Sequence, residues 1–237
     1  MKIVEIESLI VSFGFIRTDI LLTLPIVVHG VPGCGKSTLI KSLIKHRTVS
    51  ARTLGAPYGC NLLTNGVTTH LVSSPQLSNE VTILDEYQLG DASVSAGFTL
   101  LFGDPFQGTF RKAPHYIKEL SHRVPRPIAD FLVTRGYQIR GEREGSLTTK
   151  NPYNSQQGNP TAGTLLHLGR ISQSLTHSHG LCSKHPTEVA GLEFDTVTVV
   201  YHSSEIADRE AFFVACTRPT STLVLISDEF NELRTTT

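Results

Sequence analysis

The strongest constraint on the fold is a glycine-rich segment at residues 30–37, which reads GVPGCGKS. The apolar run IVVH precedes it, and the run STLIKSLIKH that follows has the spacing of a helix with a basic end. Glycines in such a loop let consecutive backbone N–H groups turn toward one anion, and the following helix adds the positive end of its dipole. The order strand, GxxxxGKS/T loop and helix therefore predicts a phosphate-binding loop in a parallel α/β fold.

The residue types in this loop assign roles around a nucleoside triphosphate. Lys36 would neutralise the β- and γ-phosphate oxygens, and the Ser37 hydroxyl would bind Mg²⁺. A dinucleotide-binding turn is excluded, because GxGxxG does not occur in the right phase. We expect the nucleotide to contact the whole loop: Gly30, Val31, Pro32, Gly33, Cys34, Gly35, Lys36, Ser37 and Thr38.

Two adjacent acids, Asp85 and Glu86, end a second apolar run at residues 81–84. Asp85 can hold the metal, while Glu86 can polarise a water for in-line attack on the γ-phosphorus. A kinase acting on a small acceptor has less need of the second acid, and the NKxD-type base-reading motif of a GTPase is not visible in the sequence. The pair therefore favours hydrolysis of the triphosphate.

A third apolar run, at residues 98–102, is followed by GDPFQ at residues 103–107. Its glycine and proline would serve an ordinary turn, which is one interpretation. Ligands of a parallel sheet, however, lie at the carboxyl ends of its strands. We therefore expect Gln107 to touch the γ-phosphate or the attacking water, with Asp104 near the same site.

The remaining pattern continues the alternation of helices and strands. Helices are expected at 2–13 and 208–217, and strands at 49–54, 164–168, 196–201 and 222–227. Between 141 and 163 the sequence is polar and rich in Gly, Pro, Asn and Gln, which predicts a loop or insertion.

Composition limits the partners and the compartment. Lys+Arg and Asp+Glu are equal at 21 each, so a nucleic acid would need a local basic groove. The four cysteines form no CxxC pair, the first residues place acids where a signal peptide needs an apolar core, and no apolar stretch could span a bilayer. We expect a soluble chain in a reducing compartment.

Two weaker clusters each leave two interpretations open. The segment 177–185 offers four potential zinc ligands, namely His177, His179, Cys182 and His185, but a solvated loop is the alternative. The basic stretch 111–126 could form a groove with Tyr116 as a stacking platform for bases, or it could be a solvated face.

Taken together, GVPGCGKST, LDEY and GDPFQ resemble motifs I, II and III of superfamily 1 helicases. Residues 53–57 (TLGAP) resemble motif Ia, 120–125 (LSHRVP) motif IV, 188–197 (EVAGLEFDTV) motif V and 214–218 (VACTR) motif VI. The motifs occur in the correct order from about residue 26 to residue 227. The compact length and the stretch LDEYQL make the chain similar to the triple gene block 1 family of potexvirus- and carlavirus-type plant viruses.

The resemblance implies a P-loop NTPase with two RecA-like parallel-sheet domains, at residues 1–121 and 122–237, the first carrying the phosphate loop. It implies ATP and Mg²⁺ between the domains, with Ser37 and Asp85 as metal ligands, and single-stranded RNA across the top. His122 departs from the aromatic residue common before the motif IV arginine, and residues 141–163 have no clear counterpart. The residues carried over are Lys36, Ser37, Asp85, Glu86 and Gln107 from the first domain, and Arg123, Gly191, Glu193 and Arg218 from the second.

The same resemblance implies an ATPase and RNA helicase that acts in cell-to-cell movement through plasmodesmata and in suppression of RNA silencing. The implied partners are single-stranded viral RNA, coat protein, other movement proteins, host silencing proteins and further copies of the chain. Membrane association would come only through partners, and the expected location is the host cytoplasm and plasmodesmata. The alternative is a binding scaffold in which ATP controls conformation without unwinding. A helicase segment of a replication polyprotein would need longer flanks.

Overall fold

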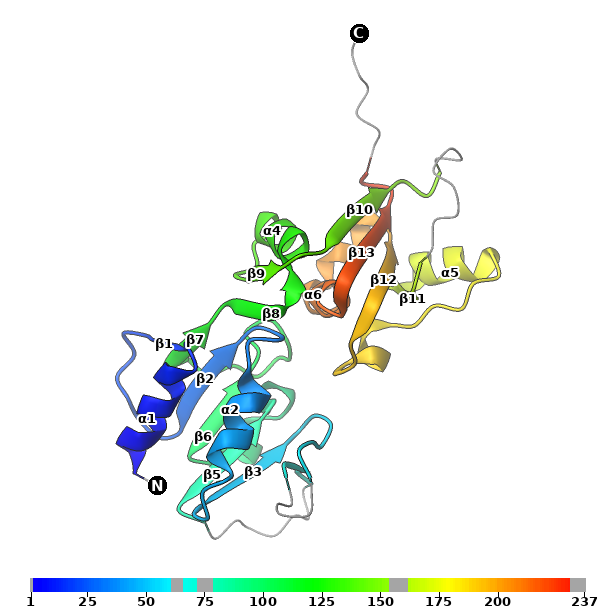
Figure 1. Cartoon of the computed structure of the whole chain (residues 1–237). Helices are drawn as coiled ribbons and strands as arrows, with labels where there is room; N and C mark the ends of the chain where they lie inside the picture. The colour runs from blue at the N-terminus through cyan, green and yellow to red at the C-terminus, as the bar shows by residue number, and fades with distance from the viewer. Residues whose placement is uncertain (1, 61–65, 72–78, 154–161, 231–237) are drawn as a thin grey trace. The chain divides into compact units, whose positions relative to one another are not determined.

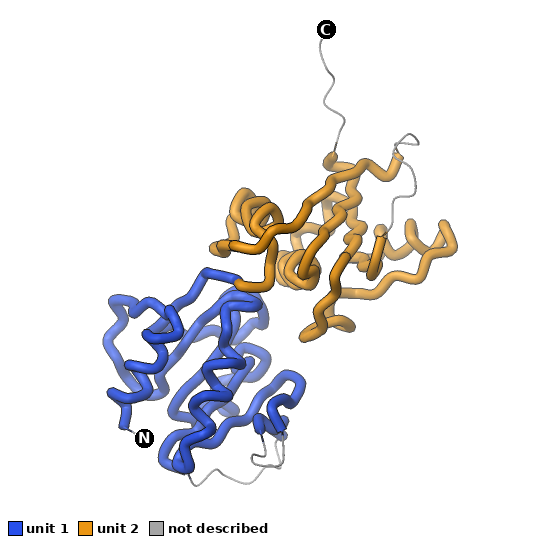
Figure 2. The backbone as a smooth tube through the Cα atoms, in the orientation of Figure 1, with its two compact units in different colours: residues 1–121 blue, residues 122–237 orange. Residues whose placement is uncertain are grey.

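The computed structural model describes residues 2–60, 66–71, 79–153 and 162–230 of the chain. The chain divides into two compact units, Met1–Ser121 and His122–Thr237, drawn in different colours in Figure 2. Each unit is built around its own sheet, labelled in Figure 1. The expected mixed α/β fold with parallel sheets is confirmed.

The described residues of the first unit form a seven-stranded sheet in the order β1-β7-β2-β6-β5-β3-β4. Short β1 pairs antiparallel with β7, and every other neighbouring pair is parallel. The strands are β1 (Ile16–Arg17), β2 (Ile26–Gly30), β3 (Val49–Thr53), β4 (Thr68–Thr69), β5 (Val81–Asp85), β6 (Leu100–Gly103) and β7 (Tyr116–Lys118).

The central strands of this sheet are buried on both faces. Val27, Leu84 and Leu101 lie in one row across β2, β6 and β5, and they pack in a cluster that includes Tyr87 and Phe98. Because side chains alternate along a strand, the neighbours of these residues point to the opposite face. The expected helices form as α1 (Ile3–Ser12) and α2 (Lys36–Leu43), which contact one another, and η1 (Tyr87–Leu89) and α3 (Ala92–Ser95) follow β5.

The second unit has a four-stranded parallel sheet in the order β10-β13-β12-β11 among its described residues. These strands are β10 (Ser146–Lys150), β11 (Thr164–His167), β12 (Phe194–Tyr201) and β13 (Pro219–Ser227). A separate pair joins β8 (Leu120–Pro125), which begins at the end of the first unit, to β9 (Arg140–Arg143). The helical elements are α4 (Arg126–Thr134), α5 (Arg170–Ser178), η3 (Pro186–Val189), η4 (Ser203–Ala207) and α6 (Arg209–Cys216).

The prediction of a loop over 141–163 was wrong for its first part, which forms most of β9 and all of β10. β10 is an edge strand with largely exposed side chains, so it carries only one large apolar residue, Leu147, and no alternating apolar pattern. Its two threonines still suit a strand. Residues 154–161 lie outside the described part of the chain.

In the described residues, no helix combines the length and the apolar character needed to cross a membrane.

Candidate nucleotide site

The loops that carry the predicted site leave one edge of the first sheet (Figure 1). Strands β2, β6, β5 and β3 are parallel neighbours, so their carboxyl ends meet at the same edge. Those ends lie at Gly30, Gly103, Asp85 and Thr53, where the segments resembling motifs I, III, II and Ia begin. The topology therefore brings together residues that are far apart in the sequence.

Glycine is required at specific points of the phosphate loop. Gly33 and Gly35 have φ values of 75° and 101°, in the left-handed region that other residues rarely adopt. A Cβ on Gly30 would lie 2.3 Å from Sγ of Cys34, because the loop folds back over its own start. Burial raises the pKa of the Cys34 thiol, so this cysteine is a packing residue and not a nucleophile.

Lys36 is the buried cation of the site, 8% exposed at the first residue of α2. Its Nζ donates a hydrogen bond to the carbonyl oxygen of Gly30 at 2.6 Å. Burial alone would lower the pKa of Lys36, but the neighbouring Cys34, followed by Asp104 and Glu86, outweighs burial and raises it. The ammonium therefore stays charged within the loop that is expected to hold phosphate.

Asp85 ends β5 and is only 3% exposed. Its Oδ2 accepts a hydrogen bond from the hydroxyl of Tyr58 at 2.8 Å, while its buried Oδ1 has no hydrogen-bond partner in the structure. Burial, followed by the charge of Glu86, raises the pKa of Asp85. A buried carboxylate oxygen without a partner is costly unless a ligand satisfies it.

The donor set fits Mg²⁺, which prefers oxygen ligands and is usually held by one or two protein groups together with substrate phosphates. Ser37 and Asp85 supply a hydroxyl and a carboxylate, and the carboxylate accepts from the Tyr58 hydroxyl through one oxygen only. The unpartnered Oδ1 of Asp85 is the atom that a hydrated cation would satisfy.

Glu86 has an unusual backbone, with φ 54° and ψ 36°. A left-handed conformation is uncommon in residues other than glycine, and such strain concentrates at functional sites. Its Oε2 accepts a hydrogen bond from Nε2 of Gln88 at 2.5 Å. Gln88 is fully buried, and Gly103 and Gly108 pack against it so closely that a Cβ on either would clash. Gln88 thus orients Glu86, a role that the sequence did not reveal.

The GDPFQ segment forms an internally bonded turn whose acid is buried. Asp104 accepts hydrogen bonds from the backbone N–H of Phe106 at 2.9 Å and from Nε2 of Gln107 at 2.7 Å. Burial raises the pKa of Asp104 to about 6, although the nearby charge of Lys36 lowers it in part. The turn and the ligand interpretations are compatible, since Asp104 lies in the electrostatic environment of Lys36 while it holds Gln107.

A second group of residues that sequence reasoning missed braces the site. Nε2 of His29, one residue before the loop, lies 2.7 Å from the hydroxyl of Tyr87, which accepts from the N–H of Lys112 at 2.9 Å. Burial, with smaller effects of Lys36 and Arg111, lowers the pKa of His29 to about 4, so the imidazole is neutral. The network joins the strand before the phosphate loop and the segment resembling motif II to Lys112, five residues after GDPFQ.

In the second unit, two of the predicted residues bond to one another, and a third bonds to the backbone. Nη1 of Arg123 lies 2.5 Å from Oε1 of Glu193. Arg218 is 3% exposed, and its Nε and Nη1 donate to the carbonyl oxygens of Val214 at 3.0 Å and Leu192 at 3.3 Å. Gly191 has a φ of 80°. These contacts join the segments resembling motifs IV, V and VI; nucleotide contact by these residues stays a prediction.

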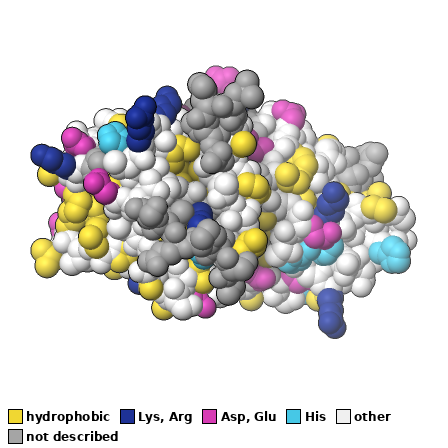
Figure 3. All heavy atoms as spheres, turned by 90° about the horizontal axis from the view of Figure 1, so that it is seen from below, with side chains coloured by type: hydrophobic (Ala, Val, Ile, Leu, Met, Phe, Trp, Pro, Cys, Tyr) yellow, Lys and Arg dark blue, Asp and Glu magenta, His cyan; other side chains and the backbone are white. Residues whose placement is uncertain are grey.

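The structure does not support a ligand site in either of the two weaker clusters, the basic stretch 111–126 and the segment 177–185. Tyr116 is buried, with its hydroxyl donating to Oε1 of Glu7 at 2.7 Å, so the stacking platform was wrong. Within the described residues there is no metal-binding group of three or more His, Cys, Asp or Glu side chains, and residues 177–185 belong to that part. On the face in Figure 3, Lys and Arg side chains are scattered among Asp and Glu.

Comparison with known proteins decides the family. A family described as "Viral superfamily 1 RNA helicase core domain" matches residues 26–227. The chain is 35% identical over 214 residues to the "Movement and silencing protein TGBp1" of Potato virus X, covering 87% of this chain and 91% of that protein. It is 36% identical over 227 residues to the protein of the same name from Apple stem pitting virus (isolate PA66), covering 93% and 98%.

The chain belongs to the TGBp1 family of viral superfamily 1 helicase-like proteins. The resemblance drawn from the motifs is thereby confirmed. Among solved structures, the arterivirus nonstructural protein 10 helicase in complex with DNA is similar, with a TM-score of 0.60 and 17% sequence identity. That match covers 87% of this chain and 61% of the helicase chain, and at this identity it supports the fold alone. A second structure of an arterivirus helicase gives a TM-score of 0.58 at 18% identity.

Proposed function

We propose that this TGBp1 family member is an Mg²⁺-dependent ATPase that binds single-stranded RNA and serves viral movement and silencing suppression. The observation that carries the proposal is the meeting of Lys36, Asp85, Glu86 and Asp104 at the carboxyl edge of one parallel sheet. A buried cation, a carboxylate with an unpartnered oxygen and an oriented second acid are the parts that triphosphate hydrolysis requires.

Each residue has a separate task in this mechanism. Lys36, which donates to the backbone of its own loop, would transfer its hydrogen bonds to phosphate oxygens. Ser37 and Asp85 would hold Mg²⁺, which supplies charge neutralisation at the β- and γ-phosphates when bound. Glu86, oriented by Gln88, would accept a proton from the attacking water, and Gln107 would contact that water or the γ-phosphate.

The biological role rests on the relatives, whose names describe movement and silencing. The expected partners are single-stranded viral RNA, coat protein, other movement proteins and host silencing proteins, in the host cytoplasm and at plasmodesmata. RNA contacts would come from local basic positions, because the net charge of the chain is zero.

A binding scaffold in which ATP controls conformation is the second candidate. It is favoured by the engagement of Arg123 with Glu193 and of Arg218 with backbone carbonyls, since each would have to give up bonds to act as an arginine finger. Single-turnover strand separation on a duplex with a single-stranded tail distinguishes helicase from scaffold.

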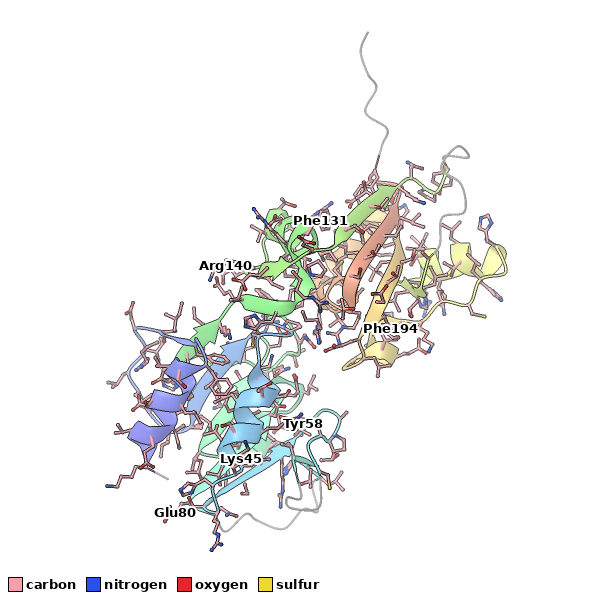
Figure 4. All side chains as sticks on the ribbon, in the orientation of Figure 1. Lys45, Tyr58, Glu80, Phe131, Arg140 and Phe194 are labelled. Atoms are coloured by element: carbon pink, nitrogen blue, oxygen red, sulfur yellow. The ribbon has the colours of Figure 1, made fainter. Side chains whose placement is uncertain are left out.

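The experiment that tests the site is Lys36→Ala. No other cation in the described loop could balance the phosphate oxygens, so ATP hydrolysis should be abolished in a folded variant. The exposed Lys45, two residues after α2, provides the matched control Lys45→Ala (Figure 4). Substantial hydrolysis by folded Lys36→Ala protein would contradict the placement of the site.

A further inference from the structure

The hydroxyl of Tyr58 occupies a central place in the predicted metal site. It donates a hydrogen bond to Oδ2 of Asp85 at 2.8 Å. Asp85, at the end of β5, is one expected Mg²⁺ ligand, and the other, Ser37, lies in α2. The phenol thus occupies one oxygen of a carboxylate that would have to face a cation.

The position of Tyr58 is fixed by its own segment. Its backbone forms an antiparallel bridge with Val67, with N–H···O distances of 3.1 Å and 2.8 Å, and Val67 is buried. The ammonium of Lys41, on α2, lies 5.6 Å from the centre of the Tyr58 ring. In Figure 4 the labelled side chain lies beside α2.

The Tyr58 hydroxyl lies where a water bound to a metal ion could otherwise donate a hydrogen bond to Asp85. In a magnesium site the cation keeps several waters, and a water that bridges the metal to a carboxylate lies at hydrogen-bond distance from the carboxylate oxygen. The Tyr58 hydroxyl lies at that distance from Asp85, while Oδ1 of the same carboxylate has no partner. The site therefore combines an oxygen held by the phenol with an oxygen that the phenol leaves unsatisfied.

We propose that Tyr58 is a residue of the metal site that competes with hydrated Mg²⁺ for Asp85, and that binding of Mg²⁺ with a triphosphate displaces its hydroxyl. The inference rests on the proposed function. The phenol donates its proton to Oδ2 of Asp85 in this arrangement. Asp85 would then exchange the hydrogen bond from the phenol for the hydrated cation, and its Oδ1 would gain a partner.

The first test measures the Mg²⁺ dependence of nucleotide binding. The full chain is titrated with Mg²⁺ in the presence of a fluorescent ATP analogue, as wild type and as Tyr58→Phe. Removing one competing hydrogen bond, about 1 kcal/mol in net terms, should lower the half-saturating Mg²⁺ concentration about three- to tenfold. Binding in EDTA should be the same for both proteins.

The matched control is Tyr116→Phe, because Tyr116 also donates to a carboxylate, at 2.7 Å from Oε1 of Glu7, but in β7. It should leave the Mg²⁺ requirement unchanged. Thermal unfolding of each variant verifies that both are folded.

The second test follows the phenol itself. The chain has six tyrosines and no tryptophan, so its emission near 300 nm reports tyrosine environments directly. Mg²⁺ with inorganic triphosphate, which does not absorb at the excitation wavelength, should increase the emission of wild-type protein as Tyr58 leaves the quenching carboxylate. Tyr58→Phe should lack this increase, and Tyr116→Phe should retain it.

The outcomes separate this inference from the function on which it rests. If wild-type protein does not bind the analogue with Mg²⁺, the proposed function fails and the inference fails with it. If wild type binds but Tyr58→Phe has an unchanged or greater Mg²⁺ requirement, competition by Tyr58 is overturned and the ATP site stands. A lower Mg²⁺ requirement together with loss of the emission change supports the inference.

Discussion

Gln107 and Asp104 form a closed pair, in which Nε2 of Gln107 donates to Oδ2 of Asp104 at 2.7 Å. Asp104 is 2% exposed and shares its electrostatic environment with Lys36. The glutamine expected to contact the γ-phosphate is therefore held by an acid that also interacts electrostatically with Lys36, the lysine expected to bind phosphate. A triphosphate that attracts Lys36 would change the charge balance around Asp104 and, through it, the position of Gln107.

The buried acid makes a prediction about pH and stability. Its pKa is about 6 in the fold against an ordinary value of 3.8, so between about pH 4 and 6 the folded chain binds more protons at this group than the unfolded chain does. Asp104 therefore makes the free energy of unfolding fall as pH rises through that range. Asp104→Asn does not titrate, so its stability relative to wild type should improve over the window by an amount on the order of 2–3 kcal/mol. Urea unfolding without nucleotide at several pH values measures this difference.

The free energy of unfolding of Asp104→Asn must be compared with that of wild type at each pH. This is necessary because His29 changes the stability of both proteins with pH in the opposite direction. Its pKa of about 4 lies below the ordinary value of 6.5, so its contribution to stability rises with pH between these values. His29 is present in both proteins and cancels. Asp130→Asn, at an exposed acid on α4, is the control. Parallel pH curves for Asp104→Asn and wild type would refute the effect of burial on Asp104.

The second prediction concerns the pair formed by Glu86 and Gln88. If Glu86 activates water and does not bind nucleotide, Glu86→Gln should keep ATP affinity while turnover falls by ~10²-fold or more. Gln88→Leu removes the amide that orients Glu86, so we expect a smaller loss, about tenfold, again with affinity unchanged. Rates and nucleotide affinities are measured separately.

The double variant tests whether the two residues act together. Because Gln88 acts through Glu86, adding Gln88→Leu to Glu86→Gln should cost little further rate. Full additivity of the two losses, or a parallel loss of affinity in either single variant, would indicate that the residues only support the fold.

The parts of the site that were predictable from sequence are those with fixed spacing. The loop with Lys36 and Ser37, and the acids Asp85 and Glu86, each follow an apolar run that became a buried parallel strand. Such runs can be recognised as strands from the sequence, because strands covered on both faces of a sheet are almost wholly apolar. Edge strand β10 lacked this signal and was missed.

The supporting residues could not be predicted for a different reason. Tyr58 reaches Asp85 from 27 positions earlier in the sequence, and His29 reaches Tyr87 across 58 positions. A tyrosine or a glutamine has no characteristic spacing to the acid it orients, so its partner is set by the register of β2, β6, β5 and β3. Only the placement of these strands side by side brings the partners together.

The last prediction concerns Arg218, whose planar guanidinium donates to the carbonyl oxygens of both Val214 and Leu192. A lysine offers a single ammonium that cannot reproduce this fork. Arg218→Lys should therefore lower the free energy of unfolding by about 1–3 kcal/mol, since hydrogen bonds from a buried charged group are lost. We also expect it to lose the acceleration of ATP turnover by RNA, while nucleotide affinity, set by residues of the first unit, stays near wild type.

The effect of Arg218→Lys on the stability of the fold must be separated from its effect on the acceleration of ATP turnover by RNA. A partly unfolded variant would be less stable and would also lose the acceleration. Turnover is measured against RNA concentration at a temperature where each protein is fully folded, with RNA binding checked independently. Arg140→Lys, at an exposed arginine of β9 labelled in Figure 4, is the matched control and should change neither property. If folded Arg218→Lys retains wild-type stimulation, Arg218 holds the segment around Leu192 and takes no part in hydrolysis, which favours the scaffold. If stimulation is lost with RNA binding intact, Arg218 couples RNA to turnover, as an arginine finger would.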